Sequence, residues 1–261
     1  MEPRAALHLA RRLLSVGLRS RNWREITLST LKGQTLSRII LRNGIEICAP
    51  DDNTLLSMVH EILLKKIYTP LFLPIEPDDI VVDIGANIGV FTLYAAKRTR
   101  NTVYAFEPFP GNAEFLRRNA ERSGFSNIIT RASAIGCKVG TARLYLSRIS
   151  GGHRLFDHYG EIKLRTFIEV PMTTLERVID DNSIKQIDFL KMDCEGAEGS
   201  ILTSTRPEYL MRIRKIAMEF HDDATQATHD AIQGLLERTG FLTRLSWDGK
   251  SPYGYIYAKR G

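Results

Sequence analysis

The chain has 261 residues, 43% of them hydrophobic, which is enough for one large α/β domain with an N-terminal extension but not for a second full domain. The formal net charge of +6 permits an acidic partner without requiring one, because much of the excess comes from arginines in the segment that ends at Arg24. The rest of the chain is nearer to neutral, so the sequence does not predict a nucleic-acid-binding surface.

Cysteine content and hydropathy exclude further classes. Cys48, Cys137 and Cys194 have neither the spacing of a zinc site nor that of a disulfide framework. No run approaches the roughly 20 apolar residues that a membrane-spanning helix needs. We therefore expect a protein of a reducing, cytoplasmic setting, peripheral to a membrane at most.

The first segment, residues 1–36, is basic and amphipathic. Within residues 5–16, apolar side chains recur between arginines. Such a helix can lie on a membrane surface, act as a targeting peptide, pack on the domain that follows, or fray at the terminus. The sequence leaves these alternatives open.

Residues 37–79 are expected to form a hairpin and a helix that pack on the core. Residues 37–47 alternate in strand fashion around the turn Arg42-Asn43-Gly44. Residues 55–68 carry apolar side chains at helical spacing, and Pro70 ends the helix.

In residues 80–261, strands and helices alternate as in a doubly wound α/β domain. The expected strands are 80–84, 102–106, 128–134, 187–192 and 215–220, and the expected helices are 90–97, 111–123, 175–179 and 228–239. Strands at 143–147 and 162–170 break this alternation and predict an insertion beside the sheet. Residues 241–246 and 253–259 predict a final hairpin, which gives the parallel sheet an antiparallel end.

The most informative feature is the strand at residues 80–84, which breaks into a glycine turn and then a helix. Gly85 and Gly89 remove side chains where a ligand must approach the backbone closely. Glu107 follows about twenty residues later, where a carboxylate can accept hydrogen bonds from both hydroxyls of a ribose. The third glycine of a dinucleotide fingerprint is missing. The pattern predicts a nucleoside-binding site that does not hold a pyrophosphate.

A second group of polar residues follows two later strands. Asp193, Glu195 and Glu198 come just after strand 187–192, and Glu219 and His221 end the next strand. Because open α/β sheets bind ligands at the carboxyl ends of their strands, we expect these side chains at one rim. Three carboxylates there are costly unless they are paired, metal-bound or catalytic, although Glu198 can also cap the next helix. His221 is the candidate to take a proton from an attacking hydroxyl.

From about Leu41 to Lys259 the sequence resembles the FkbM family of S-adenosylmethionine-dependent methyltransferases. The matching strings are V-V-D-I-G-A-N-I-G at 81–89, F-E-P at 106–108, A-I-G at 134–136 and I-D-F-L-K-M-D-C-E-G-A-E at 187–198, with Glu61 and Tyr68 before them. Cys137 departs from the acid that many members carry after A-I-G. Residues 1–34 lie outside the resemblance.

The resemblance implies a class I methyltransferase fold, which is Rossmann-like with a mostly parallel seven-stranded sheet, and S-adenosylmethionine as the methyl donor. It also implies a reaction, most often O-methylation of a hydroxyl on a sugar or a polyketide. Asp83 then either orients the glycine turn or reaches the amino group of the methionine part. The implied cofactor-binding residues are Glu61, Tyr68, Asp83, Gly85, Ala86, Asn87, Gly89, Glu107, Ala134 and Asp193.

Catalysis requires alignment of the acceptor hydroxyl and help with its proton. The rim residues could provide this directly or through a divalent ion, for which an oxygen-rich set suits magnesium better than zinc. The sequence does not say whether a metal is present. Two other functions stay open, a nucleotide-dependent oxidoreductase and a non-catalytic module of the same fold that acts through its basic N-terminal helix. No motif specifies the acceptor or the oligomeric state.

Overall fold

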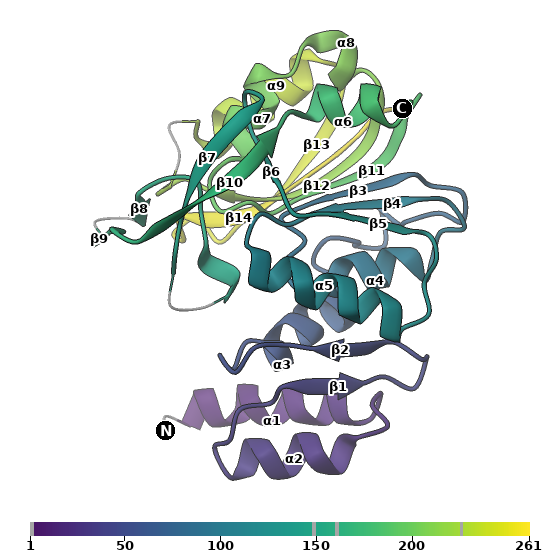
Figure 1. Ribbon diagram of the computed structural model, residues 1–261, viewed down its shortest axis with the longest axis vertical. Helices are drawn as coiled ribbons and strands as arrows, with labels where there is room; N and C mark the ends of the chain where they lie inside the picture. Colours follow the sequence, from purple (N-terminus) through teal and green to yellow (C-terminus); the bar gives the residue numbers. More distant parts are fainter. Residues whose placement is uncertain (1–2, 148–149, 160–161, 225–226) are drawn as a thin grey trace.

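The computed structural model describes residues 3–147, 150–159, 162–224 and 227–261 and has a seven-stranded central sheet (Figure 1). The strand order is β13-β14-β12-β11-β3-β4-β5, and β14 runs antiparallel to both of its neighbours. These strands are β3 (Val81–Ile84), β4 (Val103–Phe106), β5 (Ile128–Arg131), β11 (Ile187–Met192), β12 (Ile213–His221), β13 (Leu242–Ser246) and β14 (Tyr253–Lys259). The expected class I methyltransferase architecture, with an antiparallel strand near the C-terminus, is confirmed.

Helices cover both faces of the sheet (Figure 1). On one face lie α4 (Val90–Ala96) and α5 (Pro110–Arg122), and α4 is buried at every position. The other face carries α6 (Leu175–Asp181), α7 (Glu198–Ser204), α8 (Pro207–Leu210) and α9 (His229–Arg238). Because β3 is covered on both sides, all four of its residues are buried, as its unbroken apolar run predicts.

The N-terminal segment packs against α4, on the face of the sheet that this helix covers. It comprises α1 (Pro3–Gly17), α2 (Trp23–Leu31), the hairpin β1 (Arg38–Ile40) with β2 (Glu46–Cys48), α3 (Leu55–Met58) and the π-helix η1 (Val59–Lys65). Val16, Ile26 and Ile39 are fully buried in the same apolar cluster as Phe91 of α4. The expected hairpin is confirmed, with Arg38 opposite Cys48. No described helix combines the length and the hydropathy that crossing a bilayer requires.

The expected helix at 55–68 differs from the observed one. The α-helical hydrogen bonding changes to a π-helix after Met58, and the helix ends at Lys65. Lys66 then adopts a left-handed conformation with φ of 56°, which turns the chain before Pro70 is reached.

The insertion forms a second, three-stranded sheet of order β6-β10-β7 beside the central one. Its strands are β6 (Ala134–Ile135), β7 (Gly140–Tyr145) and β10 (Phe167–Thr173), and the short hairpin β8 (His158–Tyr159) with β9 (Ile162–Lys163) and the 3-10 turn η2 (Ser150–Gly152) lie between β7 and β10. The prediction that residues 128–134 form a single strand was wrong. Ala134 leaves the central sheet because it packs with Leu144, Val170 and Met172 in a separate cluster.

Candidate active site

The glycine turn after β3 is shaped by the protein atoms around it. Gly85 has a φ of +74°, and a Cβ atom there would lie 1.7 Å from the carbonyl oxygen of Asp193, which follows β11. A Cβ atom on Gly89 would lie 2.5 Å from Cδ1 of Leu116 on α5. These contacts give a reason for the two glycines that does not depend on a ligand. Neighbouring protein atoms exclude a side chain at both positions, whether or not a ligand is bound.

Asp83 lies beneath this turn and is fully buried. Its carboxylate accepts a hydrogen bond of 2.6 Å from the Thr92 hydroxyl and lies 3.1 Å from Nζ of Lys191. Lys191 in turn donates a 2.7 Å hydrogen bond to the carbonyl oxygen of Gly85. Burial lowers the pKa of Lys191, but Asp83 and Asp193 outweigh burial and raise it, so the ammonium stays charged. Of the two roles considered for Asp83, these contacts favour orienting the turn.

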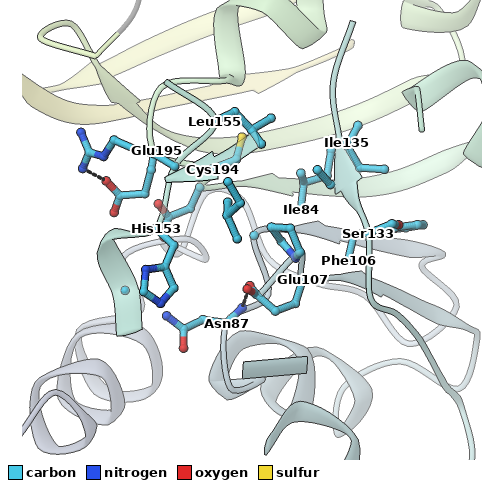
Figure 2. Close-up of a pocket in the computed structure, with 17 residues that line it drawn as sticks. Ile84, Asn87, Phe106, Glu107, Ser133, Ile135, His153, Leu155, Cys194 and Glu195 are labelled. Carbon is cyan, nitrogen blue, oxygen red and sulfur yellow. Dashed lines mark hydrogen bonds and ion pairs between the residues drawn. The ribbon is translucent and has the colours of Figure 1, made fainter. Parts of the chain in front are cut away.

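Glu107 faces a pocket at the carboxyl ends of β3 and β4 (Figure 2). Its carboxylate accepts backbone hydrogen bonds from Asn87, at 2.8 Å, and from Phe109, at 2.9 Å. Burial raises the pKa of Glu107 to about 7, although these two bonds oppose the rise. The remaining wall includes apolar and polar residues from five segments, namely Ile84, Phe106, Ser133, Ala134, Ile135, His153, Leu155 and Cys194. The cavity that these residues line has a volume of about 60 Å³.

A second pocket adjoins the first one and shares Gly85, Asn87, Gly151 and Asp193 with it. Its other walls include Glu61, Tyr68, Ala86, Lys191, Glu219 and Tyr255. The two pockets together bring eight of the ten sequence-predicted cofactor residues to one elongated site. Asp83 and Gly89 do not line either pocket, but both contribute to the conformation of the glycine turn.

The acidic rim gathers around the hydroxyl of Tyr68. This oxygen lies 2.8 Å from Oδ2 of Asp193 and 3.1 Å from Oε2 of Glu219. A hydroxyl has one proton to donate, so a proton on one of the two carboxyl groups allows both short contacts to be full hydrogen bonds. Burial, reinforced by Asp193, raises the pKa of Glu219 to about 8, so Glu219 holds that proton at neutral pH.

His221 lies deeper in the rim and faces two more carboxylates. Its Nδ1 is 3.3 Å from Oε1 of Glu198, and its Nε2 is 3.9 Å from Oε2 of Glu195. Burial works against the charged imidazole, but Glu198 and then Glu195 overcome it and raise the pKa of His221 to about 10. The imidazole therefore already carries its proton at neutral pH. A protonated imidazole cannot accept a second proton, so this charge state weighs against the expected role of His221 as proton acceptor, which stays a prediction.

Glu198 is the first residue of α7 and is buried. Its carboxylate accepts backbone hydrogen bonds from Cys194, at 2.8 Å, and from Gly196, at 2.9 Å. It therefore holds the loop between β11 and α7, in addition to its contact with His221. The helix cap considered for it from the sequence is not observed, because Ala197 occupies the cap position of α7 and no side-chain capping bond is found there among the described residues.

A groove extends from the rim toward the insertion. Its floor includes Glu195, Glu219 and His221, and its walls include Leu146, Gly152, Arg154, Lys163, Arg165, Asp223 and Tyr253. Arg154 is buried and its Nη2 lies 2.5 Å from Oε2 of Glu195. Arg154 and Glu195 also line the Glu107 pocket, so the groove and that pocket meet at this ion pair.

The residues Arg154, Lys191 and Tyr255 complete the site and were not identified from the sequence. Lys191 had a visible signal, since a lysine between apolar residues near the end of a buried strand must find buried partners. Arg154 and Tyr255 gave none, because their contacts depend on how the insertion and β14 return to the rim.

Comparison with known proteins agrees with this geometry. Residues 83–243 match the family described as methyltransferase FkbM domain. The chain is 31% identical over 246 residues to the AMB antimetabolite synthetase AmbE of Pseudomonas aeruginosa, covering 80% of this chain but only 12% of that protein. It is 28% identical over 211 residues to the 31-O-demethyl-FK506 methyltransferase FkbM of Streptomyces tacrolimicus, covering 70% of this chain and 80% of that one.

A third relative is the hexuronic acid methyltransferase AglP of Haloferax volcanii, which is 24% identical over 148 residues, with 56% of this chain and 57% of that protein covered. The family match begins at Asp83 and ends in β13, so it includes the glycine turn, Glu107 and the whole acidic rim. The chain therefore belongs to the FkbM family of methyltransferases.

Proposed function

We propose that the protein is an S-adenosylmethionine-dependent O-methyltransferase that acts on a hydroxyl group of a small molecule of the sugar or polyketide kind. The observation that carries this proposal is the shared wall of Arg154 and Glu195 between the Glu107 pocket and the groove. A donor in the pocket and an acceptor in the groove would meet at that wall. The names of two relatives, which specify an FK506 derivative and a hexuronic acid, support the acceptor class.

The two adjoining pockets fit the parts of this donor. Glu107 offers a carboxylate oxygen to ribose hydroxyls, and Ala134 and Ile135 offer apolar surface to the base. Gly85, Tyr68 and Glu61 surround the second pocket, which would take the amino-acid end. When bound, the donor supplies a methyl group already activated by a positive sulfur.

The rim residues provide alignment and a proton acceptor for the hydroxyl. Glu219, with a pKa raised to about 8, matches the requirement that a general base titrate near the working pH. Tyr68 fixes the position of this carboxyl group. His221 stays protonated, and its charge favours the ionised form of Glu219. We assign the base to Glu219 and an electrostatic role to His221.

No step in this proposal uses a metal ion. Asp193, Glu219 and His221 each offer one atom within 4.8 Å of the others, which is close enough for a divalent ion. However, the Tyr68 hydroxyl already contacts both carboxyl groups, and His221 carries a proton. The magnesium ion considered from the sequence would have to displace the Tyr68 hydroxyl and the proton of His221, so the proposal includes no metal.

Isothermal titration with S-adenosylmethionine, S-adenosylhomocysteine and NADH tests the proposal. We expect the first two to bind and NADH not to bind, which separates this function from a nucleotide-dependent oxidoreductase. Glu107→Gln should weaken binding by at least tenfold, about 1.4 kcal/mol, whereas Glu114→Gln on the exposed side of α5 should not. Absence of S-adenosylmethionine binding in the folded protein would overturn the proposal.

Turnover is measured as S-adenosylhomocysteine release against a panel of glycosides and hydroxylated polyketides, with and without magnesium. We expect at least one acceptor to be methylated in the presence of a metal chelator. Donor binding without turnover of any acceptor would instead favour the non-catalytic module.

A further inference from the structure

Exposed apolar and basic side chains gather at the end of α1, far along the chain from the methyltransferase site. Leu14 is 67% exposed and Leu18 is 66% exposed. The amide of Leu18 donates a 3.1 Å hydrogen bond to the carbonyl oxygen of Leu14, so the two side chains lie one helical turn apart on the same face. Arg11, three residues before Leu14, is also exposed on this face. Large apolar side chains in water need an explanation when they lie beside one another.

A cavity of about 280 Å³ opens next to Leu18. It lies between the end of α1, the β1–β2 turn, η1 and the end of α4, and three arginines, Arg19, Arg42 and Arg98, line it. The remaining walls are mostly apolar, namely Leu18, Leu41, Ile45, Leu63, Leu64 and Tyr94. None of the residues lining the donor pockets or the groove contributes to it.

The three guanidinium groups lack carboxylate partners within the part of the chain that the structure describes. Instead, each donates to a backbone carbonyl at 3.1 Å, Arg19 to Ser15, Arg42 to Leu18 and Arg98 to Tyr94. A guanidinium group has five N–H donors, so each retains donors for an external anion. Three like charges around one cavity repel each other, and an anion bound between them would offset this repulsion.

We propose that this face, consisting of Arg11, Leu14, Leu18, Arg19, Arg42 and Arg98, docks on the surface of a bilayer that contains anionic phospholipids. The cavity takes a lipid phosphate, and Leu14 and Leu18 enter the boundary between headgroups and acyl chains. Positive charge alone would suit a soluble phosphate equally well. The adjacent pair of exposed leucines favours a lipid surface, where apolar burial and charge attraction act together.

Vesicle co-sedimentation of the full chain tests this docking face. We expect binding to vesicles of phosphatidylcholine with phosphatidylserine, little binding to phosphatidylcholine alone, and loss of binding as salt rises. Arg19→Gln with Arg42→Gln should weaken binding by at least tenfold, since each basic residue near an anionic surface contributes about fivefold. The matched control, Arg131→Gln with Arg238→Gln, removes the same charge from exposed positions elsewhere and should bind as the unaltered protein does.

The apolar part of the docking face has its own test. Leu14→Ser with Leu18→Ser should also release the protein from vesicles, whereas Leu71→Ser with Leu242→Ser, which alters two other exposed leucines, should not. Affinity for S-adenosylmethionine should be unchanged in all these variants, so failure of this inference and failure of the proposed function are distinguishable.

Three results would overturn the inference. The first is equal loss of binding in the arginine variant and its control, which would show that vesicle binding depends on net charge rather than on this face. The second is binding of inorganic phosphate in the cavity by a protein that does not bind vesicles. This result would assign the cavity to a soluble anion. The third is self-association that the leucine variant abolishes, which would make this face a contact between two copies of the chain.

Discussion

Gly85 tolerates no side chain because the carbonyl oxygen of Asp193 already occupies the space. Gly85→Ala should therefore destabilise the protein by more than about 4 kcal/mol and abolish binding of S-adenosylmethionine, since a β11 loop that moves away also moves Asp193. Gly124→Ala provides the matched control. Gly124 has nearly the same φ, +71° against +74°, but no atom lies within 4 Å of its added Cβ.

The control should cost only the backbone strain of a left-handed alanine, about 1–2 kcal/mol. Chemical denaturation measures both values, and calorimetry measures donor binding. Similar losses in the two variants would show that the conformation of the turn, rather than its contact with Asp193, makes glycine necessary.

The ionisation of two rim residues predicts a bell-shaped dependence of turnover on pH. Activity should rise as pH increases through about 8, where Glu219 loses its proton and becomes able to accept one. It should fall through about 10, where His221 loses its charge. Because the pair is coupled, these are apparent values of the site as a whole.

His221→Asn should remove the falling limb. It should also move the rising limb to higher pH, because the imidazolium that lowers the pKa of Glu219 is gone. His158→Asn, at an exposed histidine, should leave the profile unchanged. A His221→Asn profile that keeps both limbs would refute the assignment, and retained S-adenosylmethionine affinity would show that the variant is folded.

The loop between β11 and α7 is the element that presents Glu195 to the groove. Glu195 and Gly196 both have positive φ, 55° and 105°. This conformation costs energy at Glu195, whereas glycine adopts it without steric cost. The carboxylate of Glu198 stabilises the loop by accepting hydrogen bonds from the backbone on either side.

Glu198→Gln should release this loop, because the amide NH₂ cannot accept the second hydrogen bond. We expect a loss of about 1–3 kcal/mol in the free energy of unfolding and a larger loss in turnover than in donor affinity. Glu208→Gln, at an exposed carboxylate on α8, is the control. Thermal unfolding and donor titration would contradict the role of Glu198 if both variants matched the unaltered protein.

Helices and strands were predicted correctly where apolar residues recur with a clear period along the sequence. β11 and β14 were predicted with their observed bounds, and the turn at Arg42 was placed correctly. The change from α-helix to π-helix after Met58 was not predictable, because the apolar spacing of one short segment does not distinguish the two. The departure of Ala134 from the sheet was also missed, since it depends on contacts with the distant strand β10.

The same limit applied to the site. Glu107 and the acids after β11 could be located because they directly follow apolar strands. The protonation of His221 could not be predicted, because it depends on Glu198 and Glu195, which follow a different strand and lie beside the imidazole only in the folded protein. A residue type indicates the chemistry available, and its neighbours decide the charge it carries.

The whole molecule is expected to unfold as one unit, although its first 36 residues were considered a separate extension. Val16 and Ile26 are buried in the cluster that also contains Val81 and Phe91 of the central domain. Ile26→Ala should cost about 2–4 kcal/mol. Leu28→Ala, at an exposed position of the same helix, should cost little.

Two tryptophans report on opposite ends of the chain. Trp23 lies in α2 and Trp247 follows β13. Trp23→Phe and Trp247→Phe leave one fluorescence probe each, and the two denaturation midpoints should coincide both with and without Ile26→Ala. An earlier transition at Trp23 would show that the N-terminal layer unfolds independently.

The contact between Gly85 and the carbonyl oxygen of Asp193 has a consequence for engineering this enzyme. It involves backbone atoms only, so the spacing between the two turns does not depend on which side chains surround them. Libraries that vary Lys163 and Arg165, which line the groove but not the Glu107 pocket, can therefore search for new acceptors of the proposed reaction without altering the proposed donor site. Residue 193 is different, because any substitution that shifts its backbone would displace the glycine turn as well.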